Sequence, residues 1–202
     1  MNREEEFEKF LGINTRKEDA SDNKWEEGGY AVYDTSEYEG LIRIFDKVPL
    51  KPTDTLVDFG CGMGRVLFYC NHRFMCGVTG VEYNHALYKR LLDNAEDYHA
   101  RFQGQRRKFS LLYMKAEEYV VEPEDNFFYF FNPFSSDVLH TVLDHIFASV
   151  EKNPRHITII MYYCTYDMMR TVREYPLVPK EIMKLSSYAE DPDEKVYIYH
   201  NV

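Results

Sequence analysis

The sequence predicts an α/β fold in which a mostly parallel sheet of about seven strands has helices on both faces and an antiparallel C-terminal strand. Two observations predict it. From Asp54 onward, short apolar runs alternate with stretches of helical periodicity. The first of these runs, "TLVDF", leads directly into the glycine-rich "GCGMG". Because right-handed crossovers join parallel strands, such alternation builds a sheet that helices cover on both sides.

The expected elements follow from periodicity and from capping signals. Strands are expected at residues 55–59, 77–83, 109–114, 126–134 and 156–164. Helices are expected at residues 65–74, 85–102, 136–150 and 167–175, and Asn84 should cap the second of them. Two further strands are expected within residues 181–202, around a turn at Asp191 and Pro192, which would make them an antiparallel pair.

The N-terminal region differs in character from the rest. Residues 1–29 are acidic and polar, with one short helix expected at residues 4–11. We therefore expect an acidic extension, a mobile arm or lid, outside a domain of residues 30–202. A helix should then run from Ser36 to about Lys47, because Glu39 stands three residues after Ser36 in a capping box.

The composition narrows the class of protein. A chain of 202 residues suits one well-cored domain with an elaboration. The net charge of -10 makes nucleic acid a less favoured partner, because phosphate binding depends on Lys and Arg. No run approaches the roughly 20 apolar residues of a membrane span, and the first residues lack a secretory signal, so we expect a cytoplasmic protein without a membrane partner. The four cysteines lack the spacing of zinc ligands, which predicts buried free thiols and no metal site.

The glycine loop is the main candidate for a binding site. Gly60, Gly62 and Gly64 follow a buried strand, at the edge where open parallel sheets bind ligands. A tight turn without a ligand is the alternative, but three glycines at this spacing favour a ligand. A dinucleotide fingerprint would need a glycine at Arg65. The form D-x-G-x-G-x-G, from Asp58 to Gly64, instead resembles motif I of the class I S-adenosylmethionine-dependent methyltransferases, whose sheet is Rossmann-like.

An acid at the end of the second expected strand agrees with this resemblance. Glu82 lies about 20 residues after the loop, where a carboxylate accepts hydrogen bonds from ribose hydroxyls. It would repel a ribose phosphate, which disfavours NADP and coenzyme A, whereas S-adenosylmethionine and NAD both carry a free diol. The resemblance implies cofactor contacts from Asp58, Gly60, Cys61, Gly62, Gly64, Glu82, Tyr83, Ala116, Glu117, Asn132 and Tyr33.

Two of these implied contacts have plain structural alternatives. Ala116 and Glu117 fit the place where the family lines the adenine, and the alternative for Glu117 is a surface acid. Tyr33 lies in a tyrosine-containing segment that covers the cofactor in similar family members, and it can equally pack that segment on the domain.

The fourth expected strand ends in Asn132, Pro133 and Phe134, at the motif IV position of the family. These residues resemble the Asn-Pro-Pro-Tyr/Phe motif of amino methyltransferases with one proline missing, which implies a catalytic role for all three. In that motif the Asn side chain and a proline carbonyl accept hydrogen bonds from the target amine, while the aromatic ring stacks on it. The alternative is a turn that begins with Asn-Pro and leads into the next helix.

The whole pattern looks most like small, uncharacterised bacterial members of this superfamily, over roughly residues 30–200. The resemblance implies in-line transfer of a methyl group from S-adenosylmethionine to a nitrogen or oxygen nucleophile of a small-molecule or protein acceptor. The alternatives are a non-catalytic module that binds S-adenosylmethionine or S-adenosylhomocysteine, and an NAD-dependent oxidoreductase, which Arg65 disfavours. The oligomeric state is left open.

Overall fold

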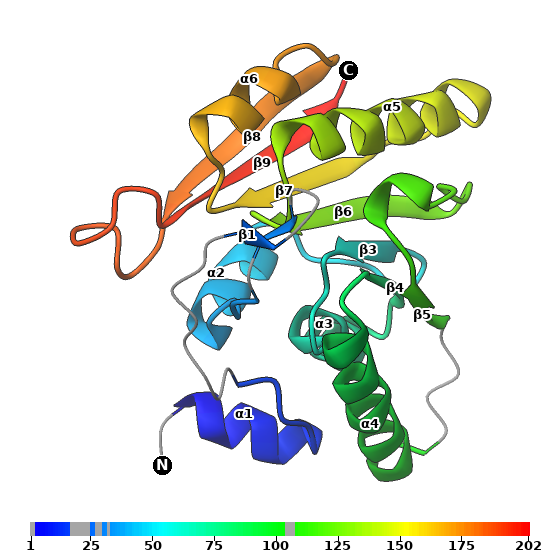
Figure 1. The fold of residues 1–202 in the computed structure, drawn as a ribbon, viewed down its shortest axis with the longest axis vertical. Helices are drawn as coiled ribbons and strands as arrows, with labels where there is room; N and C mark the ends of the chain where they lie inside the picture. Colours follow the sequence, from blue (N-terminus) through cyan, green and yellow to red (C-terminus); the bar gives the residue numbers. More distant parts are fainter. Residues whose placement is uncertain (1–2, 17–24, 27–29, 32, 104–107) are drawn as a thin grey trace.

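The computed structural model describes residues 3–16, 25–26, 30–31, 33–103 and 108–202. Among them lies a seven-stranded sheet in the order β5-β4-β3-β6-β7-β9-β8 (Figure 1). In that order the strands are β5 (Phe109–Tyr113), β4 (Gly77–Glu82), β3 (Thr55–Phe59), β6 (Asp125–Phe131), β7 (Thr158–Tyr162), β9 (Lys195–Asn201) and β8 (Leu177–Lys184). Neighbouring strands are parallel, except that β9 runs antiparallel to both β7 and β8. The predicted mostly parallel sheet with an antiparallel C-terminal strand is confirmed.

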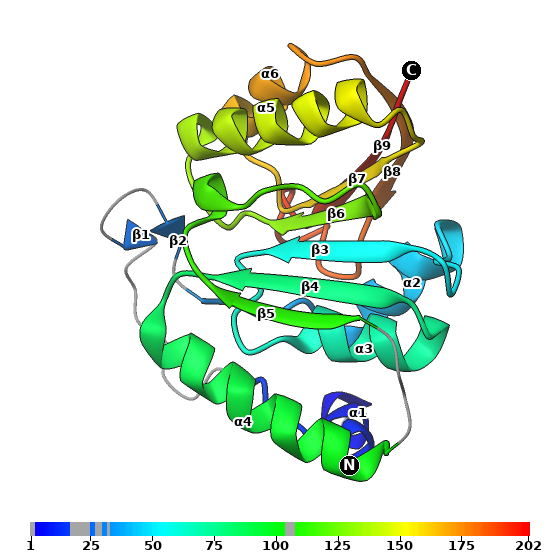
Figure 2. The same ribbon diagram turned by 90° about the vertical axis from the view of Figure 1, so that its right-hand side faces the viewer.

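Helices cover both faces of this sheet, as predicted (Figure 2). One face carries α1 (Arg3–Leu11), α2 (Tyr38–Lys47), α3 (Arg65–Phe74) and α4 (His85–Arg101). The other face carries the 3-10 helix η1 (Ala116–Glu118), α5 (Ser136–Lys152) and α6 (Tyr166–Val172). A short antiparallel pair that the sequence did not predict, β1 (Trp25–Glu26) and β2 (Tyr30–Ala31), precedes α2.

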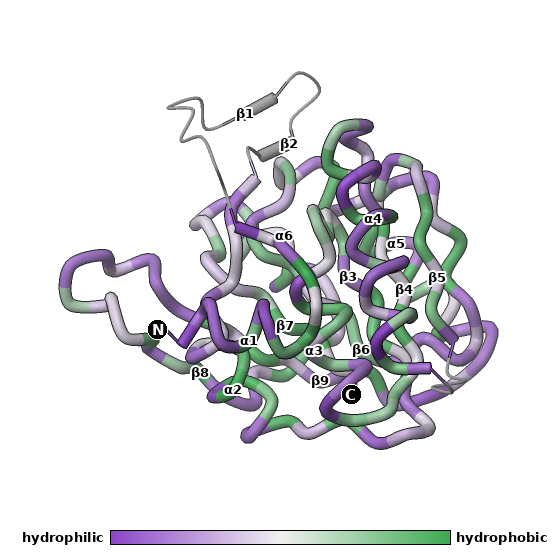
Figure 3. The backbone as a smooth tube through the Cα atoms, turned by 90° about the horizontal axis from the view of Figure 1, so that it is seen from below, coloured by the Kyte–Doolittle hydropathy of each residue, from purple (hydrophilic) through white to green (hydrophobic). Residues whose placement is uncertain are grey.

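The apolar strands explain why the sheet lies at the centre. Every residue of β3, β4 and β7 is buried, as expected of parallel strands that are covered on both faces. The side chains of β6 alternate between the two faces: Phe130 stacks on Phe59 on the α5 side, with ring centroids 5.2 Å apart, while Tyr129 belongs to the cluster on the α3 side. Figure 3 shows hydrophobic stretches running through the interior and hydrophilic stretches mostly outside it.

Most element boundaries follow the prediction within a few residues. The largest difference is β8, which begins at Leu177 and is joined to β9 by residues 185–194, a longer connection than the expected turn. The predicted cap of α4 is confirmed, because the Asn84 side chain accepts hydrogen bonds from the backbone amides of Ala86 and Leu87.

The predicted capping box at the start of α2 is wrong. The helix begins at Tyr38 with Glu37 as its N-cap, and no side-chain hydrogen bond caps it. The Ser36 hydroxyl is instead buried against β6, where it lies 2.8 Å from the hydroxyl of Tyr129. This serine therefore ties the segment before α2 to the sheet and is not available to the helix end.

Residues 3–16 pack on the sheet domain. Leu11 and Ile13 belong to the same apolar cluster as side chains of the strands. Phe7 stacks on Tyr38 with ring centroids 4.5 Å apart. This part of the acidic extension is thus built into the core rather than separate from it. The predicted boundary between residues 29 and 30 stays a prediction, since residues 17–24 and 27–29 lie outside the described residues.

The cysteines are buried, free thiols, as predicted. In the part of the chain that the structure describes, no helix has both the length and the apolar character that crossing a bilayer requires. The cytoplasmic location stays a prediction.

Phe134 belongs to the core, which corrects its predicted role. Its side chain is 0% exposed and meets Phe130 edge-on, with ring centroids 6.0 Å apart. Phe134 directly precedes the N-cap of α5, the position from which an apolar side chain packs against the fourth helical residue, here the buried Leu139. The ring therefore cannot stack on an acceptor, as the Asn-Pro-Pro-Tyr/Phe resemblance implied.

Replacement of Phe134 by Ala should lower the free energy of unfolding by about 3–5 kcal/mol, the range for removing a buried phenyl ring from a packed core. The matched control is Phe10→Ala, which removes the same atoms from a side chain that is 50% exposed and should cost far less. Chemical denaturation measures both changes. A loss below about 1 kcal/mol at Phe134 would contradict the core assignment.

Candidate functional site

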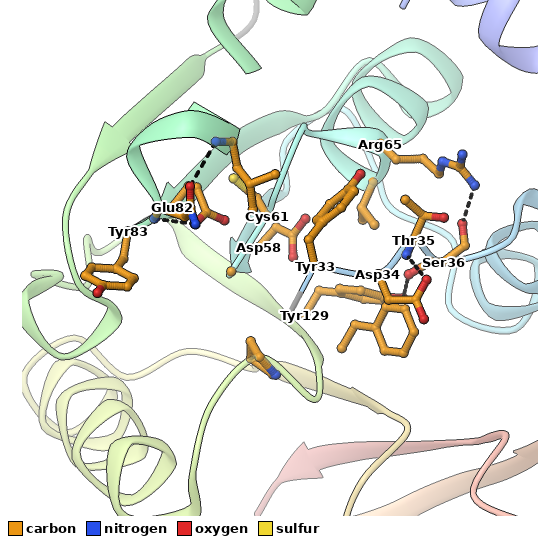
Figure 4. Close-up of a pocket in the computed structure, with 16 residues that line it drawn as sticks. Tyr33, Asp34, Thr35, Ser36, Asp58, Cys61, Arg65, Glu82, Tyr83 and Tyr129 are labelled. Carbon is orange, nitrogen blue, oxygen red and sulfur yellow. Dashed lines mark hydrogen bonds between the residues drawn. The ribbon is translucent and has the colours of Figure 1, made fainter. Parts of the chain in front are cut away.

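The carboxyl ends of β3, β4 and β6 meet at one edge of the sheet and form a pocket (Figure 4). Its walls are the glycine loop after β3, residues 82–84 at the end of β4, residue 131 at the end of β6 with residue 133 just after it, and residues 33–36 from the segment before α2. The pocket is partly open to solvent. It lies at the sheet edge where the sequence places the binding site.

Each glycine of the loop lies against a different part of the protein. Gly62 has a φ of 55°, and a Cβ there would lie 2.1 Å from Cε2 of Tyr33. Gly64 has a φ of 91°, and its Cβ would lie 2.4 Å from Leu91 of α4 and 2.7 Å from Phe68 of α3. Gly62 thus admits Tyr33 to the loop, whereas Gly64 lets the two helices pack together. Gly60 directly follows β3 and lines the pocket.

Glu82 fastens the glycine loop to the end of β4. Its carboxylate is buried and accepts hydrogen bonds from the backbone amides of Gly62, at 2.8 Å, and Asn84, at 2.6 Å. The two bonds use different oxygens of the carboxylate. The residue therefore sets the shape of the loop at the edge of the pocket.

Asp58 adds a second acid to the same pocket. Burial raises the pKa of Asp58 well above its usual value, and the nearby Glu82 carboxylate raises it further. Burial likewise raises the pKa of the Cys61 thiol, with smaller contributions from Asp58 and Glu82. A pocket with these two acids favours a ligand that carries positive charge, because an opposite charge stabilises the ionised carboxylates.

Tyr33 closes one side of the pocket. Its hydroxyl donates a hydrogen bond to the backbone carbonyl of Thr15 at 2.6 Å, and its ring edge lies against Gly62. Burial raises the pKa of Tyr33 above its usual value. Tyr33 therefore packs the N-terminal segment on the loop and also lines the pocket. Its contact with a cofactor stays a prediction.

Asn132 and Pro133 follow the end of β6. Asn132 has a φ of 41°, which is uncommon for a residue other than glycine. Its Oδ1 atom is buried and has no hydrogen-bond partner among the described residues. Such an oxygen costs free energy until a donor reaches it. Pro133 lines the pocket, whereas Phe134 lies in the core.

The remaining predicted contacts divide into two groups. Tyr83 lines the pocket next to Glu82. Ala116 is buried in the apolar cluster under α5, and neither it nor Glu117 is among the residues that line the pocket. Their contact with an adenine ring stays a prediction.

Several pocket residues were missed at the sequence level, Tyr129 and Arg65 among them. Tyr129 lines the pocket and is the one hydroxyl-bearing residue in "FFYFF", a signal that could have singled it out. Arg65 also lines the pocket, but the sequence offered it only as the residue that breaks a dinucleotide fingerprint. Its partners come from the N-terminal segment, and no local pattern pairs them.

A family model described as "Histone methylation protein DOT1" matches residues 14–125, which is more than half of the chain. The chain belongs to the DOT1 family. The matched region of this DOT1-family protein contains the glycine loop, Glu82 and the segment around Tyr33. No curated protein matches the chain.

Solved methyltransferase structures share the fold of this DOT1-family chain. An RNA methyltransferase from Salinibacter ruber in complex with S-adenosyl-L-homocysteine has a TM-score of 0.61 at 17% identity, over 83% of this chain and 93% of that one. A precorrin-6y C5,15-methyltransferase from Geobacter metallireducens has a TM-score of 0.58 at 18% identity, over 86% of this chain and 93% of that one. The predicted class, an S-adenosylmethionine-dependent methyltransferase with a class I fold, is confirmed.

Asp58→Asn should stabilise the ligand-free protein at neutral pH. Because its pKa is raised on folding, the folded state binds the Asp58 proton more tightly than the unfolded state does. Stability therefore falls as the pH rises from about 4 through the raised pKa, and the uncharged Asn avoids this loss. Melting temperatures of both proteins at pH 5 and pH 8 measure the effect.

The control for this prediction is Glu82→Gln. Glu82 is also buried, but its two carboxylate oxygens each accept a backbone amide, from Gly62 at 2.8 Å and from Asn84 at 2.6 Å. Because a Gln side chain has one oxygen, it would set its NH2 group against one of these donors, so this variant should melt at a lower temperature. If Asp58→Asn lowers the melting temperature at pH 8 as well, the ionised Asp58 stabilises the fold and the interpretation is wrong.

Proposed function

We propose that this DOT1-family chain transfers a methyl group from S-adenosylmethionine to an amine on a positively charged acceptor. The placement of Asp58 and Glu82 together beside the glycine loop carries the cofactor part of this proposal. S-adenosylmethionine brings a ribose diol, which a carboxylate binds, and a sulfonium and an ammonium group, which an acidic pocket attracts.

Within this proposal the loop and the end of β4 hold the cofactor. Glu82 fixes the loop by accepting the backbone amides of Gly62 and Asn84, and an acid at the end of this strand is suited to bind ribose hydroxyls. Gly60 and Cys61 line the pocket, and Asp58 would carry the negative charge that the cationic part of the ligand stabilises. The chemistry of these residues thus fits the group.

Asn132 and Pro133 are suited to hold the acceptor. The buried, unpartnered Oδ1 of Asn132 and the Pro133 carbonyl would accept hydrogen bonds from an amine and orient its lone pair. The bound cofactor supplies an activated methyl group on a sulfonium. A lysine acceptor would first lose a proton to solvent and become a neutral amine. Its nitrogen would then bond to the methyl carbon as the carbon–sulfur bond breaks, and the bonding electrons would stay on sulfur. Alignment of this kind is worth about 7–11 kcal/mol of the barrier.

Acidic side chains border the pocket on the side of the sheet that carries β7. Asp34 lines the pocket. The pKa of Glu194 is raised by burial first and then by the charges of Glu37, Asp191 and Asp34, so these four carboxyl groups lie near one another. We call them the acidic rim.

Two tyrosines connect the acidic rim to the pocket. Tyr162 donates a hydrogen bond to Glu194, and Tyr163 donates one to Asp191. The Tyr162 ring stacks on the pocket residue Phe131 with centroids 4.3 Å apart. A basic protein, such as the histones that the family description names, would complement this rim. A lysine-rich peptide is therefore the first acceptor to test.

Saturating S-adenosylmethionine or S-adenosylhomocysteine should raise the melting temperature by roughly 5–10 °C, and NAD should leave it unchanged. At 100 times the dissociation constant a ligand stabilises the fold by about 2.7 kcal/mol, which corresponds to this shift for a chain of this size. Thermal denaturation with each ligand measures it. A shift with NAD alone would overturn the proposed cofactor.

Two variants separate the residue that should bind the cofactor from the residue that should orient the acceptor. Glu82→Ala should weaken binding of S-adenosylhomocysteine, whereas Asn132→Ala should leave this binding intact and slow methyl transfer. Titration calorimetry gives the affinities, and circular dichroism shows that both variants are folded. Equal loss of cofactor affinity in the two variants would show that Asn132 does not face the acceptor. Binding without any transfer by the wild type would favour the non-catalytic module.

Neutralising the acidic rim should weaken binding of the acceptor and leave binding of the cofactor unchanged. In the double variant Glu37→Gln and Glu194→Gln, the KM for a lysine-rich peptide should rise by about threefold to tenfold, because each partly exposed charge contributes on the order of 1 kcal/mol or less. The control is Glu190→Gln, which removes an exposed charge from the connection between β8 and β9. Steady-state methylation assays measure both. An unchanged KM in the double variant would count against a cationic acceptor.

A further inference from the structure

Arg65 is a buried charge that the methyl transfer itself does not require. It is the first residue of α3, directly after the glycine loop, and is 4% exposed. A guanidinium group is always charged at ordinary pH, so a buried one needs anionic and hydrogen-bonding partners. The partners of Arg65 are therefore a guide to what the residue does.

The partners of Arg65 come from two segments that precede it in the chain. Its Nε donates a hydrogen bond to the Thr15 hydroxyl at 2.8 Å, and one terminal nitrogen donates to the Ser36 carbonyl at 3.1 Å (Figure 4 shows the bond to Ser36). Ion pairs join it to Glu4 at 2.5 Å and to Glu8 at 3.4 Å, both on α1. One side chain at the glycine loop thus holds α1, Thr15 and the residues just before α2.

Glu8 completes this network from the side of α1. Its carboxylate accepts hydrogen bonds from the Thr15 amide and the Thr15 hydroxyl, each at 2.6 Å, and from the Tyr38 hydroxyl at 2.9 Å. Thr15 is 0% exposed. Its hydroxyl donates to Glu8 and accepts from Arg65, so its position is set by both.

Thr15 in turn sets the position of Tyr33. The Thr15 carbonyl accepts the hydrogen bond of the Tyr33 hydroxyl, and the Tyr33 ring lies against Gly62. A closed path of contacts therefore runs from Arg65 through Thr15 and Tyr33 back to the glycine loop. Both ends of the path lie within residues 62–65, next to the proposed cofactor site.

We propose that Arg65 is a positioning residue that couples docking of residues 3–16 to cofactor binding. It fixes Thr15, which fixes Tyr33 against the loop, and so shapes the pocket wall that the cofactor meets. An isolated helix as short as α1 is marginal in water, so its order depends on these contacts. By linkage, cofactor binding and docking of residues 3–16 stabilise each other to the same extent. The coupling rests on the proposed cofactor.

Hydrogen exchange of the backbone amides in residues 3–16, with and without S-adenosylhomocysteine, tests the coupling. In the wild type the ligand should slow exchange in this segment. Tyr33→Phe keeps the ring and removes the bond to Thr15, so it should raise the dissociation constant by about fivefold, the equivalent of one hydrogen bond, and should abolish the ligand-dependent slowing. A residue that only stabilised the fold would leave that slowing in place.

Two arginine variants on the same helix give the matched comparison. Arg65→Lys keeps the charge but loses the fork that reaches Thr15 and Ser36 together, so residues 3–16 should exchange faster without ligand and the affinity should fall. Arg73→Lys changes an arginine of α3 that pairs with Asp46, and it should leave both quantities at wild-type values. If Arg65→Lys does not fold, Thr15→Val removes the hydroxyl link alone and should give the same two effects.

The outcomes separate the coupling from the proposed function. If S-adenosylhomocysteine raises the wild-type melting temperature while exchange in residues 3–16 stays unchanged, the coupling is wrong and the cofactor stands. If the ligand does not raise the melting temperature, the cofactor and the coupling are both wrong. Slowing that persists in Tyr33→Phe also overturns the coupling.

Discussion

The hydrogen bonds that Glu82 accepts from Gly62 and Asn84 hold the whole site together. They join the end of β4 to the loop that follows β3 and to the start of α4. Parallel strands place these segments at one edge. The backbone amides of Gly60 and Cys61 donate to the Val81 carbonyl of β4, and Glu82 holds the middle of the loop at Gly62. Glu82 therefore organises the pocket before any ligand arrives, and Tyr33 and Asp58 take their places around the loop that it fixes.

Several features of this edge cost stability in the free protein. Asp58 is a buried acid beside another acid, and Asn132 combines a positive φ with a buried oxygen that has no partner among the described residues. Violations of packing and charge rules that gather at one place are typical of functional sites. A cationic ligand would offset the cost of ionising Asp58. A hydrogen-bond donor on the acceptor would satisfy the buried Asn132 oxygen.

The sequence predicts those parts of the site that depend on residue patterns within one strand and the loop after it. Glycines after an apolar run and an acid at the next strand end mark the loop and Glu82, because parallel topology brings strand ends together. Phe134 was misplaced because the residue before a helix cap faces the core, whatever motif it resembles. Ser36 has the pattern of a cap, but its hydroxyl reaches Tyr129, far away in the sequence. The contacts of Arg65 with Glu8 and Thr15 could not be predicted, since pairing across so many residues depends on the assembled fold.

The central claim is that the pocket at the ends of β3 and β4 binds the methyl donor through Glu82 and the glycine loop. A crystal structure of the protein grown with S-adenosylhomocysteine tests it most directly. The ribose hydroxyls should lie within hydrogen-bond distance of the Glu82 carboxylate, and the amino-acid part should lie beside Gly60 and Asp58. A ligand bound with its ribose away from Glu82, or at any other surface of the protein, would contradict the account.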